Sequence, residues 1–184
     1  MRVQTTALTG VLIVEPQRRG DARGFFSEVF KASALAAHGI AHEWAQDNHV
    51  RTEKRGVVRG LHFQAPPHAQ AKLVRVTRGA VLDVAVDIRR DSPTYGAHVA
   101  EELSAENWRQ LYVPAGMAHG YCTLSEDAEV LYKTSAEYAP QAEMGLLWND
   151  PELDIAWPAC ADPTLLKDAD LAWPKLRDLV SPFF

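Results

Sequence analysis

The sequence has few of the residues that stabilise small secreted or metal-dependent domains. It has only two cysteines, Cys122 and Cys160, in 184 residues, which is too few for a disulfide framework. A chain of this length corresponds to about one domain and buries about 70% of the surface that it exposes when unfolded. The N-terminus lacks an apolar stretch of signal-peptide length. We therefore expect one domain over residues 1–184 and a reduced, cytoplasmic compartment.

Long hydrophobic runs and an excess of basic residues are also missing. No uncharged apolar stretch approaches the roughly 20 residues of a membrane span, and the net charge of −5 argues against nucleic-acid binding. The charge is uneven, because residues 1–90 carry 14 Lys and Arg against 8 Asp and Glu. Arginines in this half could hold an anionic small ligand, or the asymmetry could vanish when the chain folds back on itself. We expect neither a membrane nor a nucleic-acid partner.

Short apolar or alternating runs, separated by turn residues, dominate what is present. This pattern predicts strands over Val11–Val14, Gly24–Phe30, Val57–Phe63, Lys72–Thr77, Val81–Ile88, Gln110–Val113 and Ala128–Thr134. A helix is expected at Lys31–His38, ended by Gly39, and a second short one after Lys167. Many short strands with a few short helices predict a mainly β fold, a jelly-roll β-sandwich or barrel.

The run from Leu82 to Ile88 alternates most clearly. Leu82, Val84, Val86 and Ile88 point to one face of the expected strand, and Asp83, Ala85 and Asp87 point to the other. Two acidic residues on one face of a strand are unusual.

The densest polar cluster is RGLHFQ followed by QAK, which contains Arg59, His62 and Lys72. A hairpin through the two prolines between these segments could bring His62 and Lys72 together. Arg59 has the opposite parity to His62, so both face one cavity only if Gly60 marks a bulge. A single strand histidine is more often structural than functional. A lysine facing an interior changes that balance, because burying an ammonium without a partner is costly.

A second cluster, PAGMAHG, contains His119 and matches PxGxxH, the second motif of the cupin superfamily. Metal-binding cupins supply HxH and a glutamate from their first motif. Here that motif reads HFQ from His62, so its second histidine is missing. A catalytic metal usually takes at least three protein ligands. We therefore expect a cupin-type roll without a metal. A simple turn that closes a hairpin is the structural alternative for PxGxxH.

Other segments carry groups that could do chemistry or bind a ligand. Tyr132 lies on a mostly apolar strand face, where a core role is the commoner one, but its phenol could act as an acid or base. The segments DARGFFSE and QDN are rich in groups that hold phosphates and riboses. Either would pass as an ordinary loop if seen alone. No glycine-rich phosphate loop is present.

Together these segments resemble the dTDP-4-dehydrorhamnose 3,5-epimerase family. The matching segments are DARGFFSEVF, QDN, RGVVRGLHFQAPPHAQAKLV, RGAVLDVAVDIRRDSPTYG, LYVPAGMAHGY, LYKTSAEYAP, LLWNDPELDIAWP and LKDADL. The resemblance spans residues 21–171, and VVRGLHFQ with the following glutamine and lysine is its most specific part. It implies a cupin-type β-roll, a homodimer, no metal and no cofactor. It also implies epimerisation of dTDP-4-dehydro-6-deoxy-D-glucose to dTDP-4-dehydro-L-rhamnose at C3 and C5.

The resemblance further implies roles for single residues. His62 resembles the general base, paired with Asp168; Tyr132 resembles the general acid, and Lys72 the group that stabilises the enolate oxygen. Tyr138 falls where a tyrosine stacks on thymine. The remaining substrate contacts implied are Arg23, Glu28, Gln46, Asn48, Arg59, His119, Glu143 and Lys167.

Three alternatives remain open at this point. An epimerase acting at C3 alone or C5 alone would use the same catalytic groups. A metal-dependent cupin dioxygenase or isomerase is disfavoured by the missing HxH. A non-catalytic module that binds nucleotide sugars is the third.

Overall fold

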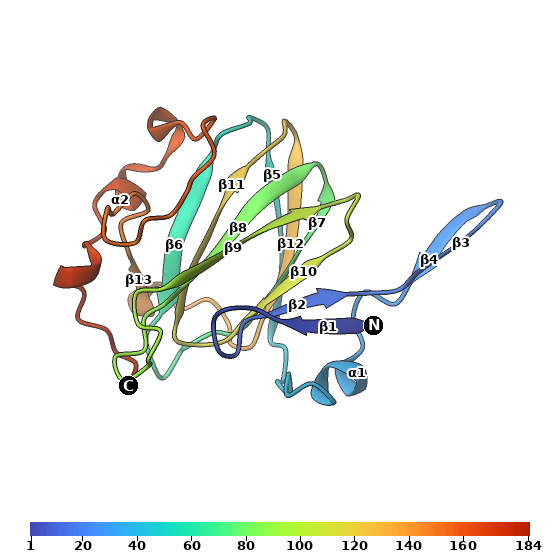
Figure 1. Cartoon of the computed structure of the whole chain (residues 1–184), viewed down its shortest axis with the longest axis horizontal. Coiled ribbons are helices and arrows are strands. Elements are labelled where there is room, and N and C mark those ends of the chain that lie inside the picture. Colours follow the sequence, from blue (N-terminus) through green and yellow to red (C-terminus); the bar gives the residue numbers. More distant parts are fainter.

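The fold is built from two antiparallel sheets that face each other, and a separate hairpin extends from them (Figure 1). The computed structural model describes all residues, 1–184. The expected mainly β fold with a few short helices is confirmed. No helix is long and apolar enough to span a bilayer.

One sheet has six strands. Their order is β1 (Arg2–Thr5), β2 (Leu12–Glu15), β10 (Gln110–Val113), β7 (Lys72–Arg78), β12 (Ala128–Thr134) and β5 (Gln46–Thr52). The other sheet has five, in the order β13 (Glu143–Gly145), β6 (Val58–Gln64), β11 (Met117–Thr123), β8 (Ala80–Asp87) and β9 (His98–Ser104). All seven expected strands are present, and β10 and β12 have the expected bounds.

The main core lies between the sheets. It contains Val74 and Val130 from the six-stranded sheet, and Ala85, Met117 and Tyr121 from the other. Because side chains alternate along a strand, every second residue counted from these core positions also points between the sheets.

The outer face of the five-stranded sheet is covered by the part of the chain that follows residue 134 (Figure 1, orange to red). This region includes α2 (Asp168–Leu171) and the 3₁₀ turns Pro140–Ala142, Pro163–Leu165 and Leu176–Asp178. Val84, Val86 and Ile88 pack there against Leu146 and Leu153. The apolar face of the Leu82–Ile88 run therefore points outward, and its acidic face points between the sheets.

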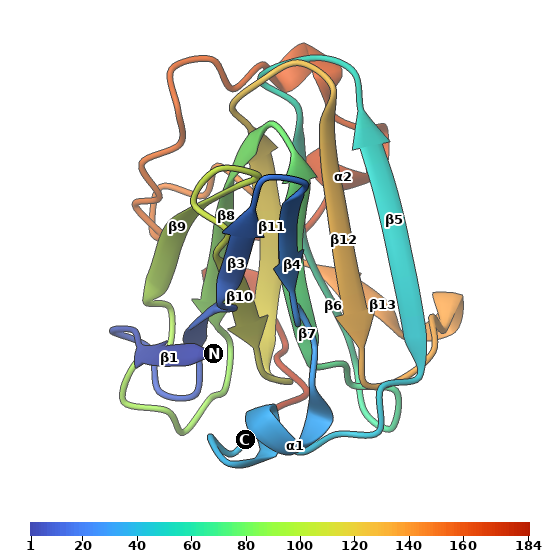
Figure 2. The same cartoon turned by 90° about the vertical axis from the view of Figure 1, so that its right-hand side faces the viewer.

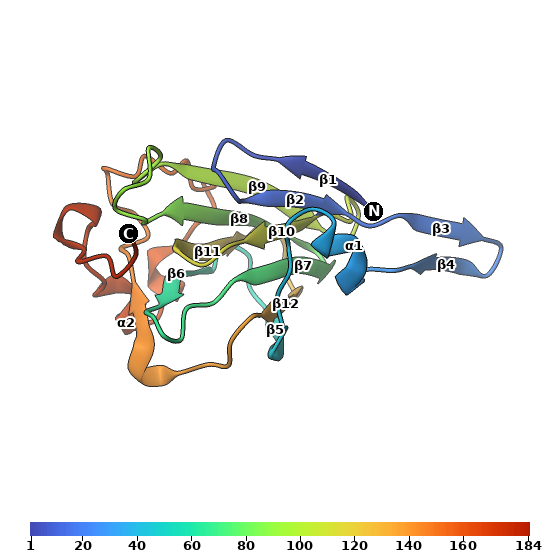
Figure 3. The same ribbon diagram turned by 90° about the horizontal axis from the view of Figure 1, so that it is seen from below.

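Part of the outer face of the six-stranded sheet is covered by α1 (Ala32–Ala36) and the loop after it (Figure 3). Leu35 and Ile40 pack there against Val14, Leu73 and Tyr112. The helix is shorter than expected, but a glycine follows it at position 39 in the left-handed region, with φ of +81°, as a C-terminal cap requires.

A hairpin of β3 (Arg18–Asp21) and β4 (Gly24–Ser27) forms an arm that projects away from both sheets (Figures 1 and 3), and seen end-on it lies in front of them (Figure 2). Phe25 and Phe26 on this arm are exposed, at 56% and 66%. The strand expected over Gly24–Phe30 therefore ends at Ser27.

The expected hairpin between the HFQ strand and the next one is wrong. β6 and β7 belong to different sheets, and the Pro66-Pro67 connection crosses from one sheet to the other. The two strands are nevertheless close at Lys72 and His62, because the Lys72 ammonium lies 3.4 Å from the backbone oxygen of His62.

Candidate active site

A pocket of about 320 Å³ is lined by strands of both sheets. Seven of the residues expected at a site meet in it: Gln46, Asn48, His62, Lys72, Tyr132, Tyr138 and Glu143. Gln64 and Gln70, which belong to the polar cluster noted in the sequence, also line it, together with Phe63 and Thr134.

His62 comes from β6 and is held by a carboxylate, but not the expected one. Its Nε2 lies 2.7 Å from Oδ1 of Asp170. The expected partner, Asp168, is exposed. The prediction of Asp168 is therefore wrong, and Asp170 takes its place. Burial alone would raise the pKa of Asp170, but its hydrogen bonds, that with His62 foremost, bring the pKa below its usual value.

The geometry of α2 explains this exchange. Successive helical residues are rotated by about 100°, so two residues apart they point to nearly opposite sides. Asp168 begins the helix and faces solvent, whereas Asp170 is buried against β6. Lys167 directly precedes the helix and is exposed as well. Trp173, just beyond the helix, lies edge-on to His62 with ring centroids 6.3 Å apart.

Lys72 begins β7 and lines the same pocket. Desolvation lowers the pKa of its ammonium to about 8, against the opposing charges of Asp83 and Glu143. An amine with this pKa is mostly protonated at neutral pH, so it can stabilise a negative oxygen.

Tyr132 projects inward from β12 and packs against the core between the sheets. In the register of the sheet, Asn48 of β5 lies opposite Tyr132 on one side and Val74 of β7 on the other. Burial raises the pKa of the Tyr132 phenol, and the charge of Arg59 opposes the rise. The phenol therefore holds its proton at neutral pH.

A β-bulge explains how Arg59 and His62 come to share one interior. His119 of β11 pairs with His62, but Tyr121, two residues further, pairs with Arg59, three residues back. The shift falls at Gly60, which has φ of +130°. The bulge at Gly60 that allows Arg59 and His62 to face the same interior is therefore present. The Arg59 guanidinium donates to the Thr52 hydroxyl at 3.2 Å.

His119 is buried and faces a second acid. Its Nε2 lies 2.9 Å from Oδ1 of Asp83, which belongs to the acidic face of β8. The PxGxxH segment is thus more than a turn, because its histidine belongs to β11 and pairs inside the molecule. No group of three or more His, Cys, Asp and Glu side chains is placed to hold a metal.

Tyr138 lies at the mouth of the pocket and is 52% exposed. Its hydroxyl donates to Glu143 at 2.9 Å, and its backbone N–H donates to the Gln46 side chain at 2.9 Å. The ring is thereby held beside the pocket with much of its surface free to stack on a flat group.

Two residues expected at the site, Arg23 and Glu28, lie elsewhere. Arg23 is at the tip of the β3–β4 arm, paired with Asp21, and Glu28 follows the arm and pairs with Lys31. Neither lines the pocket.

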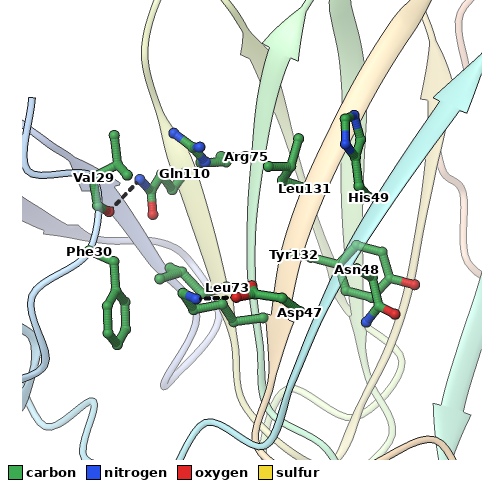
Figure 4. Close-up of a pocket in the computed structure, with 11 residues that line it drawn as sticks. Val29, Phe30, Asp47, Asn48, His49, Leu73, Arg75, Gln110, Leu131 and Tyr132 are labelled. Atoms are coloured by element: carbon green, nitrogen blue, oxygen red, sulfur yellow. Dashed lines mark hydrogen bonds and ion pairs between the residues drawn. The ribbon is translucent and has the colours of Figure 1, made fainter.

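A larger cavity of about 380 Å³ lies on the outer face of the six-stranded sheet (Figure 4). Phe30, Leu73 and Leu131 form its apolar part. Lys133 donates to Asp47 across it at 2.6 Å, and Gln110 donates to the Val29 carbonyl at 2.8 Å. Its histidine, His49, is exposed and pairs with Glu129 at 3.0 Å, and its lysine is already paired with Asp47, so the smaller pocket is the better candidate for catalysis.

Two facing antiparallel sheets around a pocket with a histidine–aspartate pair, a lysine and a tyrosine define an enzyme class that moves protons by acid–base catalysis. Residues 5–178 match the family model described as dTDP-4-dehydrorhamnose 3,5-epimerase. The chain belongs to this family.

Individual relatives agree with the family match. The chain is 52% identical to the dTDP-4-dehydrorhamnose 3,5-epimerase of Pseudomonas aeruginosa, over 92% of this chain and 93% of that protein. It is 41% identical to a dTDP-4-dehydrorhamnose 3-epimerase of Streptomyces niveus, over 86% and 76%. A solved 3,5-epimerase from Legionella pneumophila, in complex with dTDP-4-keto-L-rhamnose, has a TM-score of 0.92 at 40% identity and covers 100% of this chain and 98% of its own.

Proposed function

We propose that this protein is a dTDP-4-dehydrorhamnose 3,5-epimerase that inverts C3 and C5 of dTDP-4-dehydro-6-deoxy-D-glucose without a cofactor. The observation that supports this most strongly is the pocket itself. It gathers His62 with its carboxylate partner, Lys72 and Tyr132, which come from three strands in two sheets.

Inversion beside a ketone needs a proton removed from one side of a carbon and returned to the other. Because Nε2 of His62 donates to the Asp170 carboxylate, Nδ1 is left with its lone pair and can act as the base. The carboxylate also stabilises the imidazolium that forms. Tyr132 supplies the opposite proton, since burial raises the pKa of its phenol and keeps it protonated.

The 4-keto group makes the neighbouring C3 and C5 protons removable, because the carbanion charge spreads onto its oxygen. Lys72 stabilises that oxygen as it becomes negative. A fixed donor of this kind in a site shielded from water contributes about 2.7–4 kcal/mol.

The rest of the substrate has suitable contacts in and behind the pocket. Tyr138 offers a flat face to thymine, and stacking of this kind contributes about 1–3 kcal/mol. Gln46 and Asn48 present amides to polar groups of the substrate, and the Arg59 guanidinium suits a phosphate. These assignments rest on the family resemblance and on the position of each residue.

We also propose that the working form is a homodimer in which the β3–β4 arm of one copy reaches the pocket of the other. The arm carries two exposed phenylalanines, and β5, at the edge of the six-stranded sheet, has no partner strand on its outer side. Arg23 lies away from the pocket of its own chain, although the resemblance makes it a substrate contact. A second copy would supply it.

The expected cytoplasmic location stays a prediction.

A single-centre epimerase is the one alternative that an observation favours. The Streptomyces niveus relative, at 41% identity, is named a 3-epimerase. Both activities would use the same base, acid and lysine.

Incubating the protein with dTDP-4-dehydro-6-deoxy-D-glucose in deuterium oxide, followed by NMR, decides between these functions. A 3,5-epimerase incorporates deuterium at both C3 and C5. A single-centre epimerase labels one carbon. No labelling at either carbon, with intact dTDP binding, would overturn the proposal and leave a binding module.

A further inference from the structure

Asp83 lies in the interior behind the pocket, on the acidic face of β8, and it is completely buried. Its Oδ1 accepts from His119 at 2.9 Å. Its Oδ2 has no hydrogen-bond partner. A carboxylate left this way inside a protein is costly unless a positive charge is close by.

Titratable and charged groups from every surrounding element face this interior. They are Arg59 and His62 on β6, Lys72 on β7, His119 and Tyr121 on β11, Tyr132 on β12, Glu143 on β13 and Asp170 on α2. Two of these are permanent or near-permanent cations, Arg59 and Lys72. The guanidinium of Arg59 is directed to the Thr52 hydroxyl.

Lys72 needs a negative partner as much as Asp83 needs a positive one. The only hydrogen bond of its ammonium is a long one, 3.4 Å, to the backbone oxygen of His62. Two carboxylates act on it by charge, and Asp83 has the larger effect. The other, Glu143, is exposed at the pocket mouth and already accepts the Tyr138 hydroxyl.

We propose that Asp83 is a positioning residue that keeps Lys72 in its ammonium form and fixes the orientation of His119. The identity of the oxygen that this ammonium stabilises rests on the proposed function, but the charge pairing does not. Asp83 acts through Lys72 and His119 and need not touch the substrate.

The pairing can be measured without any reaction, by following the Lys72 side-chain resonances against pH in isotope-labelled protein. Asp83→Asn keeps the shape and can still accept from His119, but it removes the charge. The titration of Lys72 should move to lower pH by about one unit or more, the size expected for losing a nearby opposite charge. An unchanged Lys72 titration in Asp83→Asn would overturn the proposal.

Asp87→Asn is the matched control. Asp87 is buried on the same face of the same strand, but its carboxylate is bound by Arg89, Ser92 and Thr94 at the other end of β8. Removing that charge should leave the Lys72 titration where it is. An equal shift in both variants would mean that a general disturbance of β8, and no specific pairing, moves Lys72.

Deuterium exchange into the sugar gives a second measurement. Exchange that requires the ammonium falls as pH rises through the pKa of Lys72, near 8 in the natural protein. In Asp83→Asn the same fall should occur at lower pH, so the difference in rate between the variant and the natural protein should shrink as the pH is lowered. If the natural protein exchanges no deuterium but Lys72 still shifts, the proposed function fails and the pairing stands.

A third measurement does not require Asp83→Asn to fold alone. Lys72→Met removes the ammonium and leaves the Asp83 carboxylate without its cation. Adding Asp83→Asn to Lys72→Met should then raise the denaturation midpoint, because it removes an uncompensated buried charge. A lower midpoint in the double variant would contradict the pairing.

Discussion

The histidine–aspartate pair shows how much depends on one residue position. The segment LKDADL contains two aspartates, and the resemblance implied that the first of them, Asp168, pairs with His62. Asp168 and Asp170 differ only in which side of a one-turn helix they occupy, and that depends on where the helix begins. The sequence does not reveal this starting point, but the buried contact with His62 does.

The corrected pair makes a prediction with a built-in control. Asp170→Asn keeps an acceptor for Nε2 of His62 but loses the charge that stabilises the imidazolium. The rate constant kcat should fall by about 10²–10⁴-fold, the contribution typical of general acid–base catalysis, with little change in KM. Asp168→Asn, measured in the same assay, should stay within about twofold of the natural protein, because a surface substitution away from the site has little effect. The reverse ranking would restore Asp168 as the partner.

At the scale of elements, the C-terminal region acts as a support for the site. α2 carries Asp170, and Trp173 just beyond it packs on β13 and beside His62. A Cβ atom at Gly145 of β13 would lie 2.4 Å from the Trp173 ring, so only glycine leaves room for this packing. Trp173 could not be predicted from the sequence, because nothing in the pattern links it to a strand 28 positions earlier.

Gly145→Ala should therefore displace Trp173 and loosen Asp170 from His62. We expect the free energy of unfolding to fall by about 1–3 kcal/mol, as overpacking typically causes, and kcat to fall with it. Urea denaturation and steady-state kinetics measure both. In a Trp173→Leu background the same glycine substitution should cost much less. An equal cost in both backgrounds would show that the ring contact is not the cause.

The alternation of side chains predicted where strands lie and which of their faces is apolar. It did not predict which sheet each strand joins. The alternating runs correctly predicted β10 and β12 and the two faces of β8. They did not show that β6 and β7 belong to different sheets, since local sequence carries no information on partners. β5 contains QDN and looked like a loop, because its exposed outer face is polar.

At the scale of the whole molecule, the contacts within one chain do not give the arm that carries Arg23 a role in the site. Seven of the expected site residues meet in one pocket, and two remain on or beside the arm. A sequence motif does not distinguish a contact made within a chain from a contact made between chains.

Mixed dimers test the arm directly. Arg23→Ala and His62→Ala are each expected to be nearly inactive. The two variants are unfolded, mixed in equal amounts and refolded, so that about half of the dimers contain one subunit of each kind. If Arg23 acts in the partner's pocket, each of these heterodimers has one intact site of two, and about a quarter of the natural activity should return. Activity no greater than that of the separate variants would place Arg23 in its own chain's site or outside catalysis.

Replacing Phe25 and Phe26 with serine should weaken dimers in sedimentation, whereas the same change at exposed Val180 and Phe184 should not.

Inversion requires two different groups that remove and supply the proton on opposite sides of the sugar. Tyr132→Phe tests this most directly, with the dTDP-4-keto sugar in deuterium oxide and NMR as the readout. His62 should still remove and return protons, so deuterium enters the unchanged starting sugar while no inverted product forms. Full inversion by Tyr132→Phe would contradict the account, because a proton donor other than Tyr132 would then serve the second side.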